Sequence, residues 1–228
     1  LYQAGGGFGF RDQLQDSLAL AGSAPDMLRQ QILLGASRQF PEGDVQHWWH
    51  APTGAGVRTH FSDDLLWLAY ASVHYLNTTG DASRLREEIP VLGGAPIPEG
   101  AEDAYYTPTI SAQTASLYEH CARAIDRSLK VGVHGLPLMG VGDWNDGMNR
   151  VGSEGRGESV WLAWFLCRIV TDFPPIAKAQ GETARARRWE EALSGWKSAL
   201  QEHGWDGQWY RRAFFDDGQA LGASANAE

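Results

Sequence analysis

GESVWLAWFLCRIVTDFPPIAKAQG (residues 157–181) runs directly into ETARARRWEEALSGWKSALQEHG (residues 182–204), and these two segments decide the predicted fold class. In both, apolar residues recur at i, i+3, i+4 and i+7, the spacing that gives a helix one apolar face. Gly181 stands between them as a helix stop signal. The stretch therefore predicts two helices that fold back on each other.

The same periodicity recurs in four further segments, at residues 11–22, 24–40, 62–80 and 116–132. Long loops rich in Gly, Pro, His and Trp separate the helices, and such loops usually carry binding or catalytic residues. They span residues 39–61, 80–115 and 131–156.

Residues 205–218, WDGQWYRRAFFDDG, alternate around two Asp-Gly turns and predict a β-hairpin. We therefore expect an all-α chain that forms a partial (α/α)6 toroid, about half of the barrel, with long loops and a small β-hairpin near the C-terminus. An irregular helical bundle is the alternative. The absence of a low-complexity linker predicts one domain over residues 1–228.

The composition restricts the possible partners. The 28 acidic and 19 basic residues give a formal net charge of -9, which repels phosphate backbones, so we expect no nucleic acid partner. Ten tryptophans are more than a core of this size needs, and indole faces suit the C–H faces of sugar rings. Cys121 and Cys167 lie in apolar helical stretches without a metal-binding spacing, which predicts two buried free thiols.

GDWNDG (residues 142–147) places two carboxylates, an amide and an indole between two glycines. Cleavage of a glycosidic bond needs a carboxylic acid that protonates the departing oxygen, and an aromatic face that holds the sugar. Asp143, Trp144, Asn145 and Asp146 supply these groups. The alternative is that the two aspartates are turn or capping residues before the next helix. A calcium loop fails, because its fifth position is Gly147 and its sixth lacks the required glycine.

Two other stretches carry polar or aromatic groups that suit a sugar. In FRDQLQD (residues 10–16), Asp12, Gln15 and Asp16 share one helix face, although a solvated face is the alternative. In HWWH (residues 47–50), two indoles between two histidines suit a sugar cleft, and a metal site is the alternative. The polar loop NRVGSEGRGES (residues 149–159) either binds an anion through its arginines or is braced by them.

Together these motifs resemble glycoside hydrolase family 94, a family of glycoside phosphorylases that includes cellobiose and chitobiose phosphorylases. The resemblance is greatest to the phosphorylase domain of bacterial cyclic β-1,2-glucan synthases. It rests on long motifs in order along nearly the whole chain, at residues 2–16, 42–50, 56–68, 117–129 and 142–165.

The resemblance implies an (α/α)6 catalytic barrel and inverting phosphorolysis of a β-glucan to α-glucose 1-phosphate. Inorganic phosphate is then the co-substrate, with no cofactor and no metal. Asp146 would be the general acid, and Trp144 would line the subsite for the reacting glucose. Arg11, Asp12 and Asp16 would hold that sugar's hydroxyls, and the loop with His47, Trp48 and Trp49 would line the acceptor side.

Family members carry further segments before the first of these motifs and after the last residues of this chain, where most of the phosphate site lies. We therefore expect a fragment that is inactive alone, that needs the missing N- and C-terminal parts of its parent, and for which self-association is possible. The implied substrate is a β-glucan oligosaccharide, with β-1,2 linkage. The implied location is cytoplasmic, in a domain of an inner-membrane protein.

Two alternative functions stay open. An inverting β-glucan hydrolase would need a second carboxylate to activate water, for which Asp63, Asp64 and Glu119 are candidates. A non-catalytic glucan-binding module would use the same Trp and Asp residues without turnover.

Overall fold

The computed structural model describes residues 5–225, which fall into two compact units. The first unit contains the residues up to His60 together with Asp64–Arg127, and the second contains Phe61–Asp63 and the residues from Ser128 onward. The single domain expected over residues 1–228 stays a prediction. All six predicted helices are present, within a few residues of their expected ends.

The helices of the first unit pack around α3, which is buried on most of its faces. α3 is apolar over nearly its whole first half, so it lies inside the unit rather than on its surface. α1 and α2 pack on each other and on α3, and α4 packs on α3 as well. α3 ends at Gly80, whose φ of +72° is the left-handed conformation that a helix stop requires. The helices are α1 (Phe10–Ser17), α2 (Pro25–Ala36), α3 (Asp64–Thr79) and α4 (Leu117–Arg127), with 3-10 turns at Leu18–Leu20 (η1) and Ala82–Arg86 (η2).

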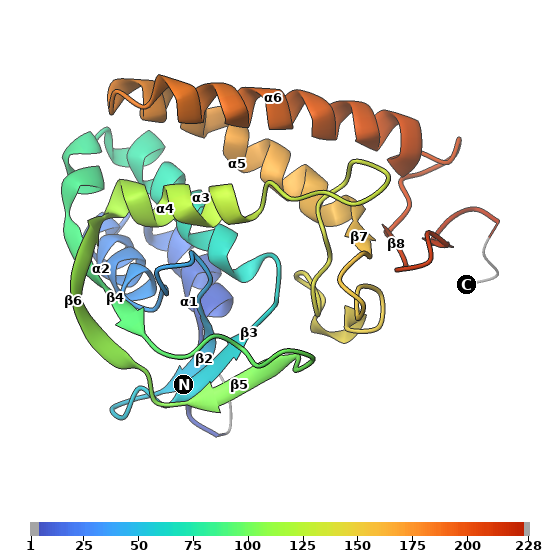
Figure 1. Ribbon diagram of the computed structural model, residues 1–228. Coiled ribbons are helices and arrows are strands. Elements are labelled where there is room, and N and C mark those ends of the chain that lie inside the picture. Colours follow the sequence, from blue (N-terminus) through green and yellow to red (C-terminus); the bar gives the residue numbers. More distant parts are fainter. Residues whose placement is uncertain (1–4, 226–228) are drawn as a thin grey trace. The chain divides into compact units, whose positions relative to one another are not determined.

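The same unit contains two antiparallel sheets (Figure 1). The larger sheet has the order β1-β2-β3-β5, and the smaller pairs β4 with β6. In the larger sheet Phe8 pairs with Trp49 and Trp48 pairs with Val57. The strands are β1 (Gly7–Gly9), β2 (Gln46–His50), β3 (Gly56–Thr59), β4 (Glu88–Gly93), β5 (Asp103–Tyr106) and β6 (Thr109–Ser116).

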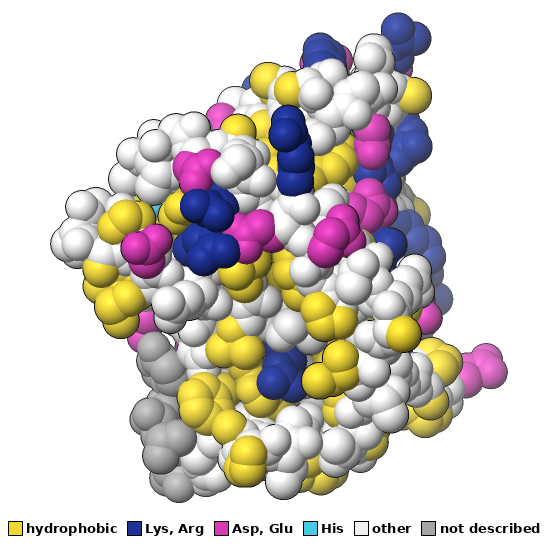
Figure 2. Space-filling view, turned by 90° about the vertical axis from the view of Figure 1, so that its left-hand side faces the viewer, with side chains coloured by type: hydrophobic (Ala, Val, Ile, Leu, Met, Phe, Trp, Pro, Cys, Tyr) yellow, Lys and Arg dark blue, Asp and Glu magenta, His cyan; other side chains and the backbone are white. Residues whose placement is uncertain are grey.

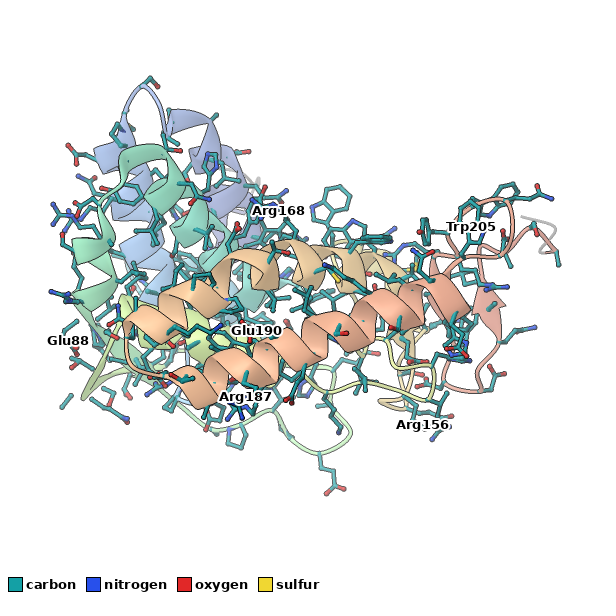
Figure 3. The ribbon with its side chains drawn as sticks, turned by 90° about the horizontal axis from the view of Figure 1, so that it is seen from above. Glu88, Arg156, Arg168, Arg187, Glu190 and Trp205 are labelled. Carbon is teal, nitrogen blue, oxygen red and sulfur yellow. The ribbon has the colours of Figure 1, made fainter. Side chains whose placement is uncertain are left out.

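The second unit is built on the helical hairpin of α5 and α6, which lie side by side in both ribbon views (Figures 1 and 3). Gly181, with a φ of +84°, makes the turn between them. Phe173 and Trp189 are fully buried and meet edge to face with 5.9 Å between ring centroids. The elements are η3 (Asp146–Met148), β7 (Glu158–Ser159), α5 (Val160–Ala179), α6 (Thr183–Ala199), a π-turn at Leu200–Gly204 (η4), β8 (Ala213–Phe214) and β9 (Ala220–Leu221).

Within the described residues, α5 is the one helix long and apolar enough to span a membrane by length and composition alone. Its most apolar window has a mean hydropathy of 1.3, and 56% of that window is buried in the structure. This burial is typical of a core helix, which passes the same test.

The prediction of an all-α, half-toroid fold is wrong. Residues 5–225 contain three antiparallel sheets beside the helices, so the chain is mixed α and β. The strands are two to eight residues long, and most lie in the segments that were expected to be loops. Strands this short lack a clear alternation, and several of them pair with strands far away in the sequence, as β1 does with β2 and β7 with β8, so local periodicity does not reveal them.

The predicted hairpin over residues 205–218 is present in altered form. Trp205 and Tyr210 form an isolated bridge around the first Asp-Gly pair. β8 and β9 pair around the second one and extend the hairpin to Leu221, while β7 joins them as a third strand.

The prediction of two buried free thiols is confirmed. Burial raises the pKa of Cys121 to about 12 and that of Cys167 to about 11. Both thiols therefore stay protonated and unreactive in the folded chain at neutral pH.

Charges of both signs mix on the surface. On the face that Figure 2 shows, Lys and Arg side chains lie beside Asp and Glu side chains, with hydrophobic side chains between them. Surface ion pairs such as Lys178–Glu190 at 2.6 Å follow the same pattern.

Truncation of the indole between α5 and α6 should destabilise the second unit. Trp189→Ala removes a fully buried ring and leaves a cavity against Phe173, so we expect a loss of about 3–5 kcal/mol in the free energy of unfolding. Urea unfolding, followed by circular dichroism, measures it. Arg187→Ala changes an exposed residue of the same helix and should shift the midpoint little. Equal effects from both variants would contradict the packing described here.

Candidate functional site

The GDWNDG loop passes from the interior to the surface of the second unit within two residues. Asp143 is fully buried, whereas Trp144 is 52% exposed and Asp146 is also exposed. An exposed indole and an exposed carboxyl group therefore lie two positions apart on a surface loop whose base is inside the protein.

The carboxylate of Asp143 is held by groups from three other places in the chain. Arg212 forms a bidentate ion pair with it, with Nη1 2.8 Å from Oδ2 and Nη2 2.5 Å from Oδ1. The Ser159 hydroxyl donates to Oδ2 at 2.6 Å, and the Asn145 amide donates to Oδ1 at 3.1 Å. Ser159 also caps α5 by accepting from the amide of Leu162. Both oxygens of Asp143 are thus engaged inside the protein, as the turn and capping alternative expects.

Asn145 makes the next turn of the loop. Its side-chain oxygen accepts from the Gly147 amide at 3.0 Å and caps the short helix η3. Two successive turns of this type, at Asp143 and Asn145, define the backbone around Trp144 and Asp146. Contact of Asp143 or Asn145 with a sugar stays a prediction.

The loop is also fixed at its first residue. The Gly142 carbonyl accepts from the Ser62 amide at 2.9 Å and from the Ser62 hydroxyl at 3.1 Å. A Cβ atom at Gly142 would overlap the ring of Phe61, so only glycine fits there. The start of the motif therefore has little freedom to move.

In the first unit, Asp64 gathers several predicted sugar-binding residues. It is buried and lies 2.7 Å from Nδ1 of His47 and 3.8 Å from Nη1 of Arg11. Asp12, whose side chain is 44% exposed, lies 4.0 Å from Nε of Arg11. The structure thus brings Arg11, Asp12 and His47 together, whereas Asp16 is exposed on α1. The sequence offered Asp64 as a candidate hydrolase base and as an acid in the first turn of its helix, but did not predict its contacts with His47 and Arg11.

The two indoles of the HWWH motif differ in burial. Trp49 is 2% exposed, with Phe8 stacked on it at 6.2 Å and the Arg38 guanidinium 4.9 Å from its ring centre. Trp48 is half-buried and packs 5.8 Å from the exposed ring of Tyr105. Neighbouring residues of a strand point to opposite faces, which explains the difference. Trp49 belongs to the core, so we keep only Trp48 for the predicted sugar contact.

The polar loop before β7 surrounds an anion from its own chain. The backbone amides of Glu154, Arg156 and Gly157 donate to the carboxylate of Asp216 at 2.8–2.9 Å. Burial alone would raise the pKa of Asp216, but these three backbone donors outweigh it and lower the pKa. The anion that this loop binds is therefore the Asp216 carboxylate of the same chain, which stabilises the loop.

Helix α4 uses its charged motif for structure. His120 is fully buried, with Nδ1 2.8 Å from the Gln39 side-chain oxygen and Nε2 3.1 Å from the Ile89 carbonyl. Glu119, which was a candidate second carboxylate, accepts from Nε of Arg123 at 3.1 Å.

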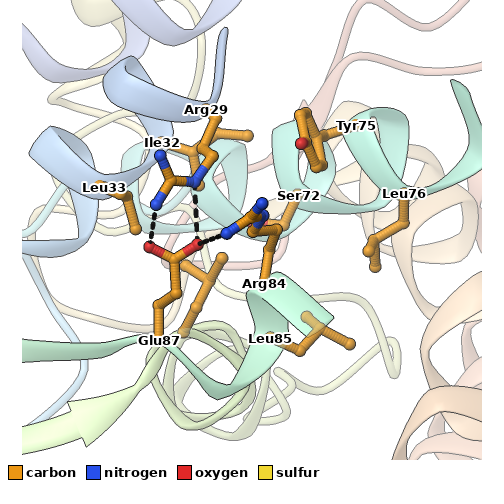
Figure 4. Close-up of a pocket in the computed structure, with 10 residues that line it drawn as sticks. Arg29, Ile32, Leu33, Ser72, Tyr75, Leu76, Arg84, Leu85 and Glu87 are labelled. Atoms are coloured by element: carbon orange, nitrogen blue, oxygen red, sulfur yellow. Dashed lines mark hydrogen bonds and ion pairs between the residues drawn. The ribbon is translucent and has the colours of Figure 1, made fainter. Parts of the chain in front are cut away.

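Two cavities are lined by residues outside the GDWNDG loop. The smaller, of about 10 Å³, has room for one water and lies beside the Arg29–Glu87–Arg84 ion cluster (Figure 4). The larger, of about 570 Å³, is an open hollow between the loops around Lys130, Arg156 and Asp217. Neither is lined by Trp144 or Asp146. Among residues 5–225, no three His, Cys, Asp or Glu side chains group as metal ligands.

Comparison with known proteins identifies the class. The family model described as "Glycosyl hydrolase 94 superfamily, catalytic domain" matches residues 1–228. The chain therefore belongs to the glycosyl hydrolase 94 superfamily and matches the model of its catalytic domain.

Several individual proteins are similar to this chain. The chain is 50% identical, over 228 residues, to a cyclic β-(1,2)-glucan synthase of Rhizobium meliloti, and covers 8% of that protein. It is 32% identical over 224 residues to a solabiose phosphorylase of Paenibacillus borealis, with 97% of this chain and 26% of the relative covered. It is 25% identical over 250 residues to an N,N'-diacetylchitobiose phosphorylase of Vibrio furnissii, with 97% and 28% covered. The chain thus spans a small part of each of these relatives.

The carboxylate of Asp216 should stabilise the second unit in a pH-dependent way. Because its pKa is lowered in the folded state, its contribution is complete above the ordinary Asp pKa of about 3.9 and is lost as the pH falls through the folded-state pKa. We expect Asp216→Asn to lower the free energy of unfolding at pH 7, and the difference from wild type to shrink below about pH 4.

Urea unfolding between pH 7 and pH 3 measures this difference. Asp217→Asn is the matched control, since the Asp217 carboxylate accepts a backbone hydrogen bond from Gln219 within its own turn. A loss from Asp216→Asn that is the same at every pH would contradict the role given to the three amides.

Proposed function

We propose that this chain carries the acid and part of the sugar site of a glycoside phosphorylase that cleaves a β-glucan with inorganic phosphate. The observation that carries the proposal is that Trp144 and Asp146 are both exposed, two positions apart, on a loop whose base is fixed by the buried Asp143. Membership of the family and the phosphorylases among its relatives support it.

In the proposed reaction, Asp146 is the general acid. An oxygen of phosphate forms a bond to the anomeric carbon while the bond from that carbon to the glycosidic oxygen breaks. The departing oxygen takes the proton of Asp146, and the products are a shortened glucan and α-glucose 1-phosphate with inverted configuration. Phosphate is already an anionic nucleophile, so no second carboxylate has to activate a water molecule.

The remaining residues would hold the sugar. We assign the indole of Trp144 to the apolar face of the reacting glucose and Arg11, Asp12 and Asp16 to its hydroxyls. His47 and Trp48 would contact the acceptor side. We propose a β-1,2-linked substrate because the relative with 50% identity bears the name of a β-(1,2)-glucan synthase. The location proposed on the same basis is the cytoplasmic side of a bacterial inner-membrane protein.

The test uses the full-length protein that contains this chain. Incubated with linear β-1,2-glucan, it should release glucose 1-phosphate only when phosphate is present. Asp146→Asn should lower that rate by about 10²–10⁴-fold, which is the usual contribution of a general acid. Asp172→Asn, an aspartate on α5 that pairs with Arg168, is the matched control and should leave the rate unchanged.

Each other result has a definite meaning. Reducing sugar released without phosphate would replace the proposal by a hydrolase. Binding of glucan without any product would replace it by a glucan-binding module, and full activity of Asp146→Asn would remove Asp146 from the acid role.

A further inference from the structure

Arg212 approaches the acid loop from a distant part of the sequence. It lies 69 residues after Asp143, next to β8, and its guanidinium meets both carboxylate oxygens of that buried aspartate. Arg212 was absent from the residues predicted to form the site. No local pattern in YRRAFF points to the acid loop.

The backbone of Arg212 is itself fixed. Its amide donates to the Leu221 carbonyl at 2.9 Å, and its own carbonyl accepts from the Val160 amide at 3.3 Å. The residue after it, Ala213, pairs with Ser159 in the β7–β8 ladder. The guanidinium therefore extends from a backbone that is tied to the start of α5 as well as to β9.

Asp143 transmits this constraint to the loop. One of its oxygens also accepts the Asn145 amide, and Asn145 in turn accepts the Gly147 amide. Trp144 and Asp146 occupy the positions between these anchored residues. If the ion pair with Arg212 were lost, Asp143 would be a buried charge without its cation. The loop would then have to shift to bring the Asp143 carboxylate to water.

We propose that Arg212 is a positioning residue for the phosphorolysis reaction: by holding Asp143, it sets the position of the Asp146 carboxyl group. The inference rests on the proposed function, in which Asp146 is the acid. Arg212 acts through Asp143, and Ser159 supports the same carboxylate from the N-terminus of α5.

The dependence on the leaving group distinguishes positioning from mere stabilisation. A sugar alkoxide departs only if it receives a proton, so a displaced acid slows cleavage of a glucan. A 2,4-dinitrophenolate departs as a stable anion without a proton, so the same displacement costs little. A general loss of structure would slow both reactions alike.

The experiment measures kcat and KM of the full-length protein with phosphate and two donors, a linear β-1,2-glucan and 2,4-dinitrophenyl β-glucoside. Arg212→Lys keeps the positive charge but loses the planar fork that grips both oxygens. We expect kcat on the glucan to fall about a hundredfold, the scale of a misplacement of about 1 Å, with the aryl glucoside nearly unaffected. Asp146→Asn should show the same selectivity.

Arg168→Lys is the matched control. Arg168 on α5 also pairs with an aspartate at 2.5 Å, but its side chain is 52% exposed (Figure 3), and both donors should react as with wild type. Ser159→Ala serves if Arg212→Lys does not fold. It removes one donor to Asp143 without changing charge, and should give a smaller loss that is again confined to the glucan.

Equal losses on both donors, or no loss on either, would overturn the positioning role of Arg212. A wild-type protein that yields no glucose 1-phosphate from glucan would instead overturn the proposed function, and the inference with it. The two failures are distinguishable because the first requires an active wild type.

Discussion

A carboxylate that is buried away from water needs a cation or several N–H or O–H donors, and the second unit is organised around two such groups. Asp143 is held by Arg212 and Ser159. Glu158 accepts from the backbone amides of His134 and Leu136, both at 3.0 Å, and from the His134 ring. Removing one partner from a buried ion pair costs about 3–5 kcal/mol, so each carboxylate ties its partners firmly in place.

These two carboxylates connect segments that the sequence separates. Glu158 and Ser159 are adjacent in β7. Glu158 binds the loop at His134 and Leu136, which precedes the GDWNDG motif, and Ser159 contacts Asp143 within the motif. A Cβ atom at Gly132 would overlap the Glu158 side chain, so the loop approaches as closely as its backbone allows. The loop with Trp144 and Asp146 is therefore long, but its conformation is restricted. The proposed active site requires this, because it must hold the reacting atoms in place.

Buried carboxylates of the first unit are likewise held by cations or hydrogen-bond donors. Asp44 forms a bidentate pair with Arg58 at 2.6 and 2.8 Å, and the Arg58 guanidinium lies 3.8 Å from the centre of the Phe40 ring. Asp64 orients His47 and faces Arg11. Arg11 and His47 are proposed sugar contacts. Their side chains are therefore oriented before substrate binds, so that less ordering is needed on binding.

What the sequence could predict follows from how local each signal is. The helices show in the sequence because an apolar face repeats within a few turns, as in α5 and α6. The larger sheet does not, because β1 and β2 are short and pair although α1 and α2 lie between them in the sequence. The family was recognisable from contiguous motifs such as GDWNDG. The partner of Asp143 was not, since ion pairing between distant residues leaves no local pattern. The HWWH motif suggested two equivalent indoles, because its letters do not show which face of the strand is covered. In the structure Trp49 is buried and Trp48 is not.

The two aspartates of the DWND motif occupy opposite environments. In the proposed mechanism the acid must reach the glycosidic oxygen of the substrate, and the exposed position of Asp146 meets this requirement. An anchor must instead stay in place, and Arg212 with two further donors holds both carboxylate oxygens of Asp143 inside the protein. Two side chains of the same chemistry can therefore stand three positions apart and divide the work, because one is exposed on the loop and the other is buried at its base.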